Sequence, residues 1–176
     1  MEKERVLLDY ILELRKKTFC RKFVGALTIE LLKKEFAEFG LNVSNRDVFV
    51  EGVPNELDLL IAKKDAHAEA NLVYNSDDVL AVLEVKFRGS YGKKNIDRIK
   101  AVFDSAIAAN KNIECFYLTV SENSRYKHRA TRAKLGYDCF ELLTRDTNLE
   151  SALKKDRIKE TGEWQKLLER LKILRV

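Results

Sequence analysis

Apolar residues recur along the chain at two spacings, and each spacing predicts a different kind of element. Near the start, Leu7, Ile11 and Leu14 lie three or four positions apart, as on one face of a helix. A second helical pattern runs over about 19–39 and stops at Gly40, a residue common just past a helix end. We therefore expect two helices before the first strand.

Short apolar runs bounded by turn residues predict the strands that follow. We expect strands over 47–52 and 56–62, with the only proline, Pro54, in the turn between them. Residues 79–87 are apolar except near their end, where Glu84 and Lys86 stand. That pattern is typical of a central strand with both faces covered.

Helical spacing then returns over about 96–107, and a further strand is expected over 113–120. A strand, a helix and another strand indicate a right-handed parallel crossover. After it we expect a helical segment up to Gly136, a strand over 137–143 and C-terminal helices. The predicted order is α, α, β, β, β, α, β, α, β, α, in one α/β domain over 1–176 with a mixed sheet.

Composition excludes several classes of protein. The 176 residues are 45% hydrophobic and 35% charged, which suits a globular domain and excludes wholesale disorder. No apolar run approaches the roughly 18 residues that a membrane span needs, and the charged N-terminus is unlike a secretory signal. The cysteines, Cys20, Cys115 and Cys139, form no CxxC pair, so we expect reduced thiols in a cytoplasmic protein.

The net charge of +5 is distributed unevenly. Residues 14–22 carry five basic side chains and no acid, 86–100 carry six against one acid, and 121–136 carry five against one. The rest of the chain is therefore net negative. Basic stretches that converge in space form a surface for a polyanion, whereas stretches that stay apart are ordinary solvated helix ends.

Three charged residues interrupt the apolar strands. Asp58 stands among leucines, while Glu84 and Lys86 are two positions apart and so project from the same face of a strand. Burying an ionised group costs several kcal/mol, on the order of magnitude, unless it is paired or bound to a metal. Two arrangements meet that need. One is a structural ion pair with the lysine, and the other is a site for Mg²⁺ or Mn²⁺, which prefer hard oxygen ligands.

Asp58, followed 26 residues later by Glu84-Val85-Lys86, resembles the PD-(D/E)xK motif of the restriction-endonuclease-like nuclease superfamily. The element order also resembles that superfamily's αβββαβ core, over about 19–120, with a mixed central sheet flanked by helices. Residues 121–176 would then be a C-terminal extension. The resemblance implies that Asp58, Glu84 and the carbonyl of Val85 bind the metal and that Lys86 is the catalytic lysine.

The resemblance also implies a glutamate from the first core helix, and Glu30 matches that role. It lies on the apolar side of the predicted helix, although an exposed glutamate on an imperfectly amphipathic helix explains it equally well. One feature departs from the motif: Pro54 does not directly precede the acid. Glu56 and Asp58 therefore compete for the ligand role, and we favour Asp58 because apolar residues flank it on both sides.

These features lead to the hypothesis of a metal-dependent nuclease that hydrolyses phosphodiester bonds, in DNA rather than RNA, through a water activated by Mg²⁺ or Mn²⁺. Its phosphate contacts would come from basic residues after the central strand and in the third basic stretch: Lys93, Lys94, Lys100, Arg125, Lys127, Arg129 and Arg132. Cutting both strands of a duplex often calls for two copies, so a homodimer fits the hypothesis.

Two rivals remain. In the first, the chain keeps the nuclease fold as a catalytically silent nucleic-acid-binding or assembly subunit. Its binding of nucleic acid would then be insensitive to replacement of Asp58 or Glu84. In the second, it is a protein-binding module that uses the apolar face of the last helix, formed by Trp164, Leu167, Leu168 and Leu171. That stripe is more typical of a core face or a homodimer contact.

Overall fold

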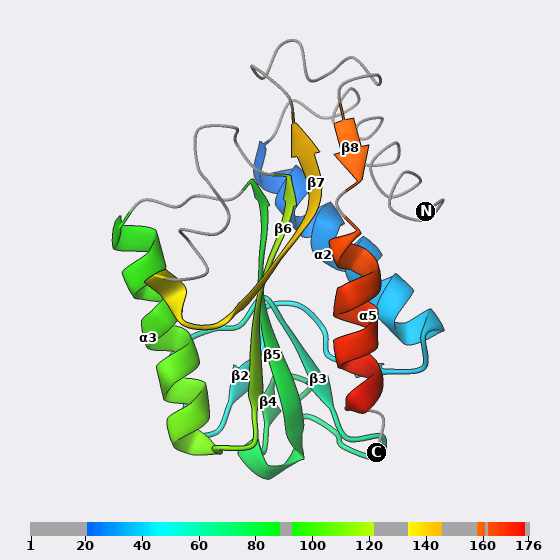
Figure 1. The fold of residues 1–176 in the computed structure, drawn as a ribbon. Coiled ribbons are helices and arrows are strands. Elements are labelled where there is room, and N and C mark those ends of the chain that lie inside the picture. Colours follow the sequence, from blue (N-terminus) through cyan, green and yellow to red (C-terminus); the bar gives the residue numbers. More distant parts are fainter. Residues whose placement is uncertain (1–20, 89–92, 122–133, 146–157, 161, 175–176) are drawn as a thin grey trace.

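The computed structural model describes residues 21–88, 93–121, 134–145, 158–160 and 162–174 (Figure 1). In chain order its elements are α2 (Arg21–Glu38), β1 (Asn42–Val43), β2 (Phe49–Val50), β3 (Leu59–Ala62), β4 (Val73–Tyr74), a 3-10 turn (Ser76–Asp78), β5 (Val79–Arg88), α3 (Lys93–Ala109), β6 (Glu114–Ser121), β7 (Asp138–Arg145), β8 (Ile158–Glu160) and α5 (Glu163–Ile173). The helix expected over 7–14 and most of the basic segment 121–136 lie outside this part of the chain.

Six strands form one mixed sheet in the order β1-β3-β5-β6-β7-β8. The three central strands β5, β6 and β7 run parallel to one another, and β3 pairs with β5 in the antiparallel sense. α3 connects β5 to β6, so the predicted parallel crossover is confirmed. A second, two-stranded sheet joins β2 and β4.

Helices cover both faces of the large sheet, with α3 on one side and α2 and α5 on the other (Figure 1). Each face has its own apolar cluster. Alternate residues of β5 serve the two clusters: Leu83 and Val85 pack toward α2 and α5, while Val82 packs toward α3. This two-sided burial explains why β5 is an almost continuous apolar run in the sequence.

The helix that follows β5 has the buried face that its sequence predicts. α3 buries Ile96, Ile99, Phe103 and Ala106, residues three or four positions apart. α2 ends where Gly40 adopts a φ of 84°, and the N–H of the next residue donates to the carbonyl of Phe36. A positive φ is open to glycine at little steric cost, which is why the helix stops there.

Several strand boundaries differ from the predicted ones. The expected strand over 47–52 is only the two-residue β2, and the expected strand over 56–62 begins at Leu59, so Asp58 lies just before β3 rather than within it. The two-residue strands β1 and β4 and the three-residue strand β8 are unexpected, because runs this short carry no periodicity.

The C-terminal residues complete the fold. β7 and β8 extend the sheet, and α5 packs Trp164, Leu167 and Leu171 into the same cluster as α2. The core interpretation of that apolar stripe is therefore confirmed. Cys115 and Cys139 are buried and form no disulfide within the described residues, and burial raises the pKa of Cys115 to about 12. Within the described ranges, no helix has the length and apolar character needed to cross a membrane.

Candidate active site

Strand register brings Asp58 and Glu84 together. β3 and β5 are antiparallel with Leu59 opposite Leu83, so one step further along the register Asp58 faces Glu84. Residues directly opposite each other in an antiparallel pair project from the same face of the sheet. The backbone N–H of Val85 donates to Oδ2 of Asp58 at 2.8 Å, which fixes this carboxylate at the edge of β5.

Lys86 joins the two carboxylates. Its Nζ lies 2.8 Å from Oδ2 of Asp58 and 2.7 Å from Oε1 of Glu84. Glu84 and Lys86 project from the same face of β5, as their two-residue spacing predicts, and the structure shows that α3 covers this face. The three charged residues that sequence analysis singled out in the strands therefore form one cluster near the C-terminal end of β5.

Burial sets the electrostatics of this cluster. The side chain of Glu84 is only 5% exposed, against 22% for Asp58 and 31% for Lys86. Burial raises the pKa of Glu84, the negative charge of Asp58 raises it further, and the nearby cations only partly offset this shift. Burial alone would lower the pKa of Lys86, but the charges of Glu84 and Asp58 outweigh burial and raise it.

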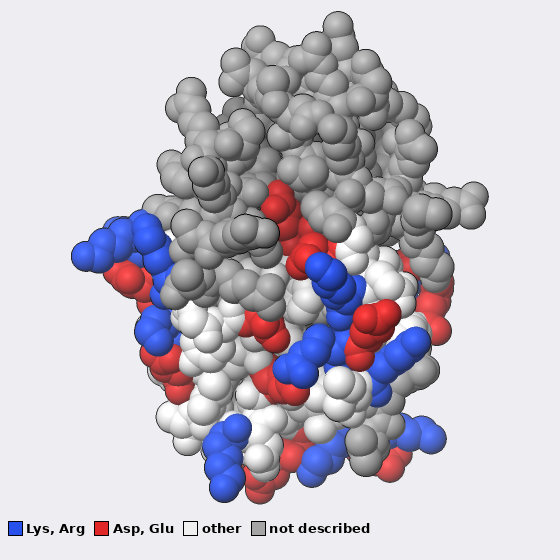
Figure 2. Space-filling view, viewed as in Figure 1, with Lys and Arg blue, Asp and Glu red and all other residues white. Residues whose placement is uncertain are grey.

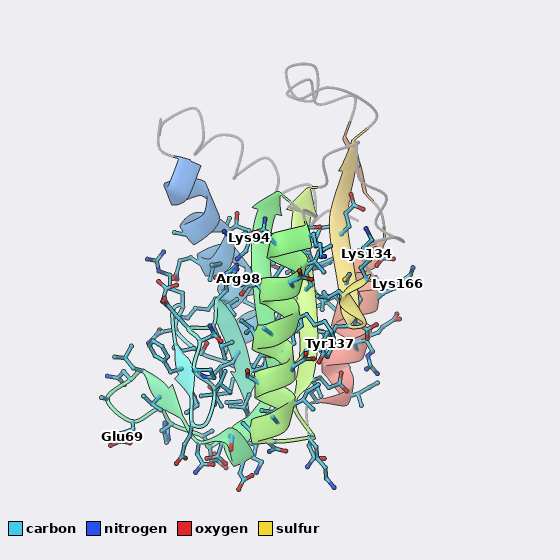
Figure 3. The ribbon with its side chains drawn as sticks, turned by 90° about the vertical axis from the view of Figure 1, so that its left-hand side faces the viewer. Glu69, Lys94, Arg98, Lys134, Tyr137 and Lys166 are labelled. Carbon is cyan, nitrogen blue, oxygen red and sulfur yellow. The ribbon has the colours of Figure 1, made fainter. Side chains whose placement is uncertain are left out.

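Arg98, which is not among the site residues predicted from the sequence, also belongs to the cluster. Its Nη2 donates to Oε1 of Glu84 at 2.8 Å from α3, the layer that covers this face, while 58% of its side chain is exposed. Figure 3 shows Arg98 and Lys94 near the N-terminal end of α3. The sequence placed Arg98 in the second basic stretch, but spacing alone could not show which of those cations turns toward the sheet.

A second missed feature is a row of polar residues across the central strands. Lys86 lies opposite Thr119 on β6, and Thr119 lies opposite Glu141 on β7. Both are buried, Thr119 at 1% exposure and Glu141 at 6%. Glu141 interrupts an apolar strand just as Glu84 does, so the same sequence signal could have found it.

The other expected acids lie elsewhere. Glu30 is exposed on α2, which buries Ile29, Leu32 and Phe36 against the opposite face of the sheet from Glu84. The expectation that Glu30 lies on the apolar side of its helix is therefore wrong, because the buried stripe passes it by. Glu56 is also exposed, and no interaction of the described residues joins either glutamate to the cluster.

The cations expected to contact nucleic acid are only partly within the described chain. Lys93, Lys94 and Lys100 are exposed on α3. Lys100 pairs with Asp104 at 3.5 Å and lies 5.7 Å from the ring centroid of Tyr137. The remaining residues of the predicted set lie outside the described ranges: Arg125, Lys127, Arg129 and Arg132. Across the described part of the face in Figure 2, basic and acidic side chains are interspersed.

The donor set of the cluster fits a hard divalent cation. Two carboxylate oxygens, one of them buried, converge on a single point at Nζ of Lys86. No group of three or more His, Cys, Asp or Glu side chains suited to a metal occurs within the described residues. An ion held by Asp58 and Glu84 would therefore take its other ligands from the Val85 carbonyl, water or substrate, as Mg²⁺ commonly does.

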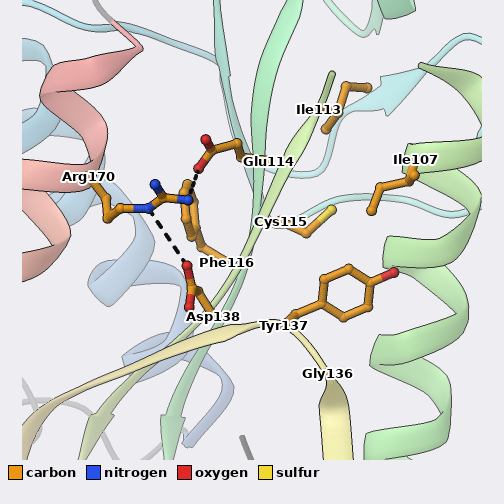
Figure 4. Close-up of a pocket in the computed structure, with 9 residues that line it drawn as sticks. All are labelled: Ile107, Ile113, Glu114, Cys115, Phe116, Gly136, Tyr137, Asp138 and Arg170. Atoms are coloured by element: carbon orange, nitrogen blue, oxygen red, sulfur yellow. Dashed lines mark hydrogen bonds and ion pairs between the residues drawn. The ribbon is translucent and has the colours of Figure 1, made fainter. Parts of the chain in front are cut away.

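A cavity of about 530 Å³ lies away from this cluster, at the opposite end of β6 and β7 (Figure 4). There Arg170 of α5 reaches Glu114 at 3.0 Å and Asp138 at 3.7 Å. Tyr137 lines the other side, and its hydroxyl donates to Asp104 at 2.5 Å. Burial, then the Asp104 carboxylate, raises the pKa of Tyr137. We name Arg170, Glu114 and Asp138 the α5 charge cluster.

The element order, the mixed sheet and its helical layers define a restriction-endonuclease-like α/β fold. Among solved structures, the chain is similar to NucC of E. coli MS115-1 in its cAAA-bound form, with a TM-score of 0.64 and 11% identity, over 98% of this chain and 86% of that one. It is also similar to NucC of P. aeruginosa ATCC27853 in its cAAA-bound form, with a TM-score of 0.61 and 11% identity, over 98% of this chain and 90% of that one.

The apo form of E. coli NucC gives a TM-score of 0.57 at 11% identity, over 95% of this chain and 90% of that one. No family model matches the chain, and neither does any curated protein. At 11% identity these likenesses show the fold alone.

Proposed function

We propose that the chain is a metal-dependent nuclease that hydrolyses phosphodiester bonds in DNA. The observation that carries this proposal is the position of Lys86 Nζ, 2.8 Å from Asp58 and 2.7 Å from Glu84 at the end of a central strand. The restriction-endonuclease-like fold shared with NucC supports it, because the NucC proteins are DNA nucleases.

Each residue of the cluster has a distinct task in this proposal. Asp58 and Glu84 would hold Mg²⁺ or Mn²⁺ together with the carbonyl of Val85. When bound, the ion supplies Lewis-acid polarisation of the phosphodiester. Lys86, held between the two carboxylates, orients the attacking water by hydrogen bonding and balances negative charge as the phosphorane-like transition state develops.

The substrate side of the site faces α3. Its exposed cations Lys93, Lys94 and Lys100 would hold the phosphate backbone, and such contacts carry no base sequence information by themselves. Binding should therefore fall steeply as the salt concentration rises. We assign DNA rather than RNA as the substrate, and a panel of both tests this choice.

Cleavage by the purified chain tests the proposal. Mg²⁺ or Mn²⁺ is supplied with single-stranded, double-stranded and branched DNA and with RNA, and products are resolved on denaturing gels. Lys86→Ala should lower the cleavage rate about 100-fold or more, the usual scale for losing a group that assists proton transfer or charge development. Lys166→Ala is the control, since Lys166 also pairs with a glutamate at 2.8 Å, on the surface of α5.

Absence of cleavage across the panel, or full cleavage by Lys86→Ala, would contradict the proposal. The rival is a silent subunit that keeps the fold, and the mutual compensation of charges among Asp58, Glu84, Lys86 and Arg98 favours it, because ion pairs alone satisfy these residues. A silent subunit would bind DNA in a salt-sensitive way, and Asp58→Asn would leave that binding unchanged with or without metal.

A further inference from the structure

One oxygen of Glu84 accepts hydrogen bonds from two cations. Its Oε1 lies 2.7 Å from Lys86 Nζ and 2.8 Å from Arg98 Nη2. A Mg²⁺ ion would lie about 2.1 Å from a carboxylate oxygen that binds it. An ion at Oε1 would therefore stand beside both positive groups, and the three cannot share this oxygen without strong repulsion.

The two cations differ in how firmly the structure holds them at Glu84. Lys86 is 31% exposed and is held a second time by Asp58, at 2.8 Å. Arg98 is 58% exposed, and Glu84 is its one ion-pair partner among the described residues. Arg98 reaches Glu84 from α3, whereas Lys86 is built into the same strand. Arg98 is thus the cation that can move off Glu84 without breaking another ion pair.

A phosphate group offers Arg98 a better partner. The guanidinium is planar and presents parallel N–H donors that match two phosphate oxygens, whereas the structure gives it a single bond to Glu84. Lys94 lies four residues earlier, on the same side of α3, so a phosphate near Arg98 also meets a second cation. The exposed part of Arg98 is the part that such a ligand would reach first.

We propose that Arg98 couples phosphate binding to metal binding. In the free protein it occupies Oε1 of Glu84 and keeps the affinity for a divalent cation low. A phosphate of the nucleic-acid strand draws it away, so that Lys86 is the one cation of the described residues left beside that oxygen and a divalent ion at Glu84 meets less repulsion. This rests on the proposed nuclease function, since the phosphate belongs to its substrate. Arg98 acts here as a positioning residue, through Glu84.

Equilibrium binding of Mn²⁺, followed by electron paramagnetic resonance, tests this coupling. Without DNA, Arg98→Ala should bind Mn²⁺ about tenfold more tightly than the wild type, within the usual range of coupling between two sites. A phosphorothioate DNA duplex should raise Mn²⁺ affinity of the wild type by a similar factor and have little effect on the variant. Because coupling is reciprocal, Mn²⁺ should raise duplex affinity equally in the wild type.

Three variants make the result specific. Arg98→Gln removes the charge but keeps part of the stem, and it should behave like Arg98→Ala. Arg98→Lys keeps a cation and should restore weak Mn²⁺ binding in the absence of DNA. Arg170→Ala removes another partly exposed arginine, 44% exposed, whose carboxylate partners are Glu114 and Asp138, and it should leave Mn²⁺ affinity unchanged.

Equal or weaker Mn²⁺ binding by both Arg98→Ala and Arg98→Gln would overturn the inference, and so would the absence of Mn²⁺ binding in every variant. These outcomes are separate from failure of the proposed function. A chain that cleaves no substrate still gives the Mn²⁺ comparison, because the measurement is made at equilibrium and needs no turnover. A chain that cleaves DNA while its Arg98 variants bind Mn²⁺ as the wild type does would retain the function and lose the coupling.

Discussion

In the part of the chain that the structure describes, a cation lies between two carboxylates at two places, at opposite ends of the central strands. In the candidate active site, Lys86 lies 2.8 Å from Asp58 and 2.7 Å from Glu84. In the α5 charge cluster, Arg170 lies 3.0 Å from Glu114 and 3.7 Å from Asp138. The chemistry is similar, but the surroundings are not.

Burial separates the two clusters. The carboxylates of Glu114 and Asp138 are 29% and 33% exposed, so water already satisfies part of their charge. Glu84 is 5% exposed, and burial raises its pKa in spite of two neighbouring cations. A cluster that holds a buried carboxylate with a shifted pKa is typical of functional sites. The α5 charge cluster, whose carboxylates are hydrated, is typical of a protein surface.

Removing the cation should produce the largest difference between the clusters. Lys86→Met leaves Asp58 and Glu84 facing each other in a buried place, and we expect a loss of about 3 kcal/mol in the free energy of unfolding. Arg170→Met should cost less than about 1 kcal/mol, since its partners remain hydrated. Urea denaturation of both variants, in metal-free buffer at neutral pH, measures the two values.

Methionine keeps the apolar stem in both variants, so the comparison isolates the charge. Similar losses for the two variants would mean that burial does not distinguish the clusters. A loss for Lys86→Met accompanied by a changed slope against urea would point instead to an altered unfolded state.

Neutralising the buried carboxylate should have a smaller effect, of opposite sign. Because its raised pKa means that the ionised form of Glu84 is disfavoured in the folded state, Glu84→Gln should raise the free energy of unfolding by about 1 kcal/mol at neutral pH. Lys86 keeps Asp58 as a partner in this variant. Glu114→Gln, in the exposed cluster, should change stability by less than about 0.5 kcal/mol.

Thermal and urea unfolding of Glu84→Gln and Glu114→Gln measure these two changes in stability. A stability gain in Glu84→Gln together with lost cleavage would place Glu84 among residues kept for function at a cost in stability. Destabilisation by Glu84→Gln as large as that of Lys86→Met would contradict the assignment, because it would mean that the carboxylate serves the fold.

The comparison also explains what could be predicted from the sequence. Glu84 and Lys86 stand at the end of a long apolar strand, and their shared face follows from the two-residue period of any strand. The register between β3 and β5 is harder to predict from the sequence. Only the pairing of Leu59 with Leu83 decides that Asp58, and not the exposed Glu56, faces Glu84.

Contacts between layers could not be predicted at all from local pattern. Arg98 reaches Glu84 because of the position at which α3 packs on the sheet. In the sequence, one cation of a basic stretch cannot be distinguished from the next as the one that makes this contact. Glu30 was misplaced for a similar reason: the buried stripe of α2 is decided by the sheet beneath it, through Ile29 and Phe36. Glu141 carries the same sequence signal as Glu84, an acid that interrupts an apolar strand.

The smallest expected effect is the pH dependence of the stability difference between the wild type and Glu84→Gln. The unfolded chain has the ordinary glutamate pKa, near 4.5, and the folded chain has a higher one. Below pH 4.5 Glu84 is protonated in both states and contributes no electrostatic penalty. Between pH 4.5 and the folded pKa, only the unfolded state gains from ionisation, so the wild type loses stability that the variant keeps. The advantage of Glu84→Gln should therefore grow from about pH 4.5 upward and level off once Glu84 is ionised in the folded protein. Urea midpoints of both proteins, measured in metal-free buffers from pH 4 to 8, give this difference directly. An advantage that shrinks with rising pH would show that the ionised form of Glu84 is favoured by its cations, and the two clusters would then differ in exposure but not in electrostatic strain.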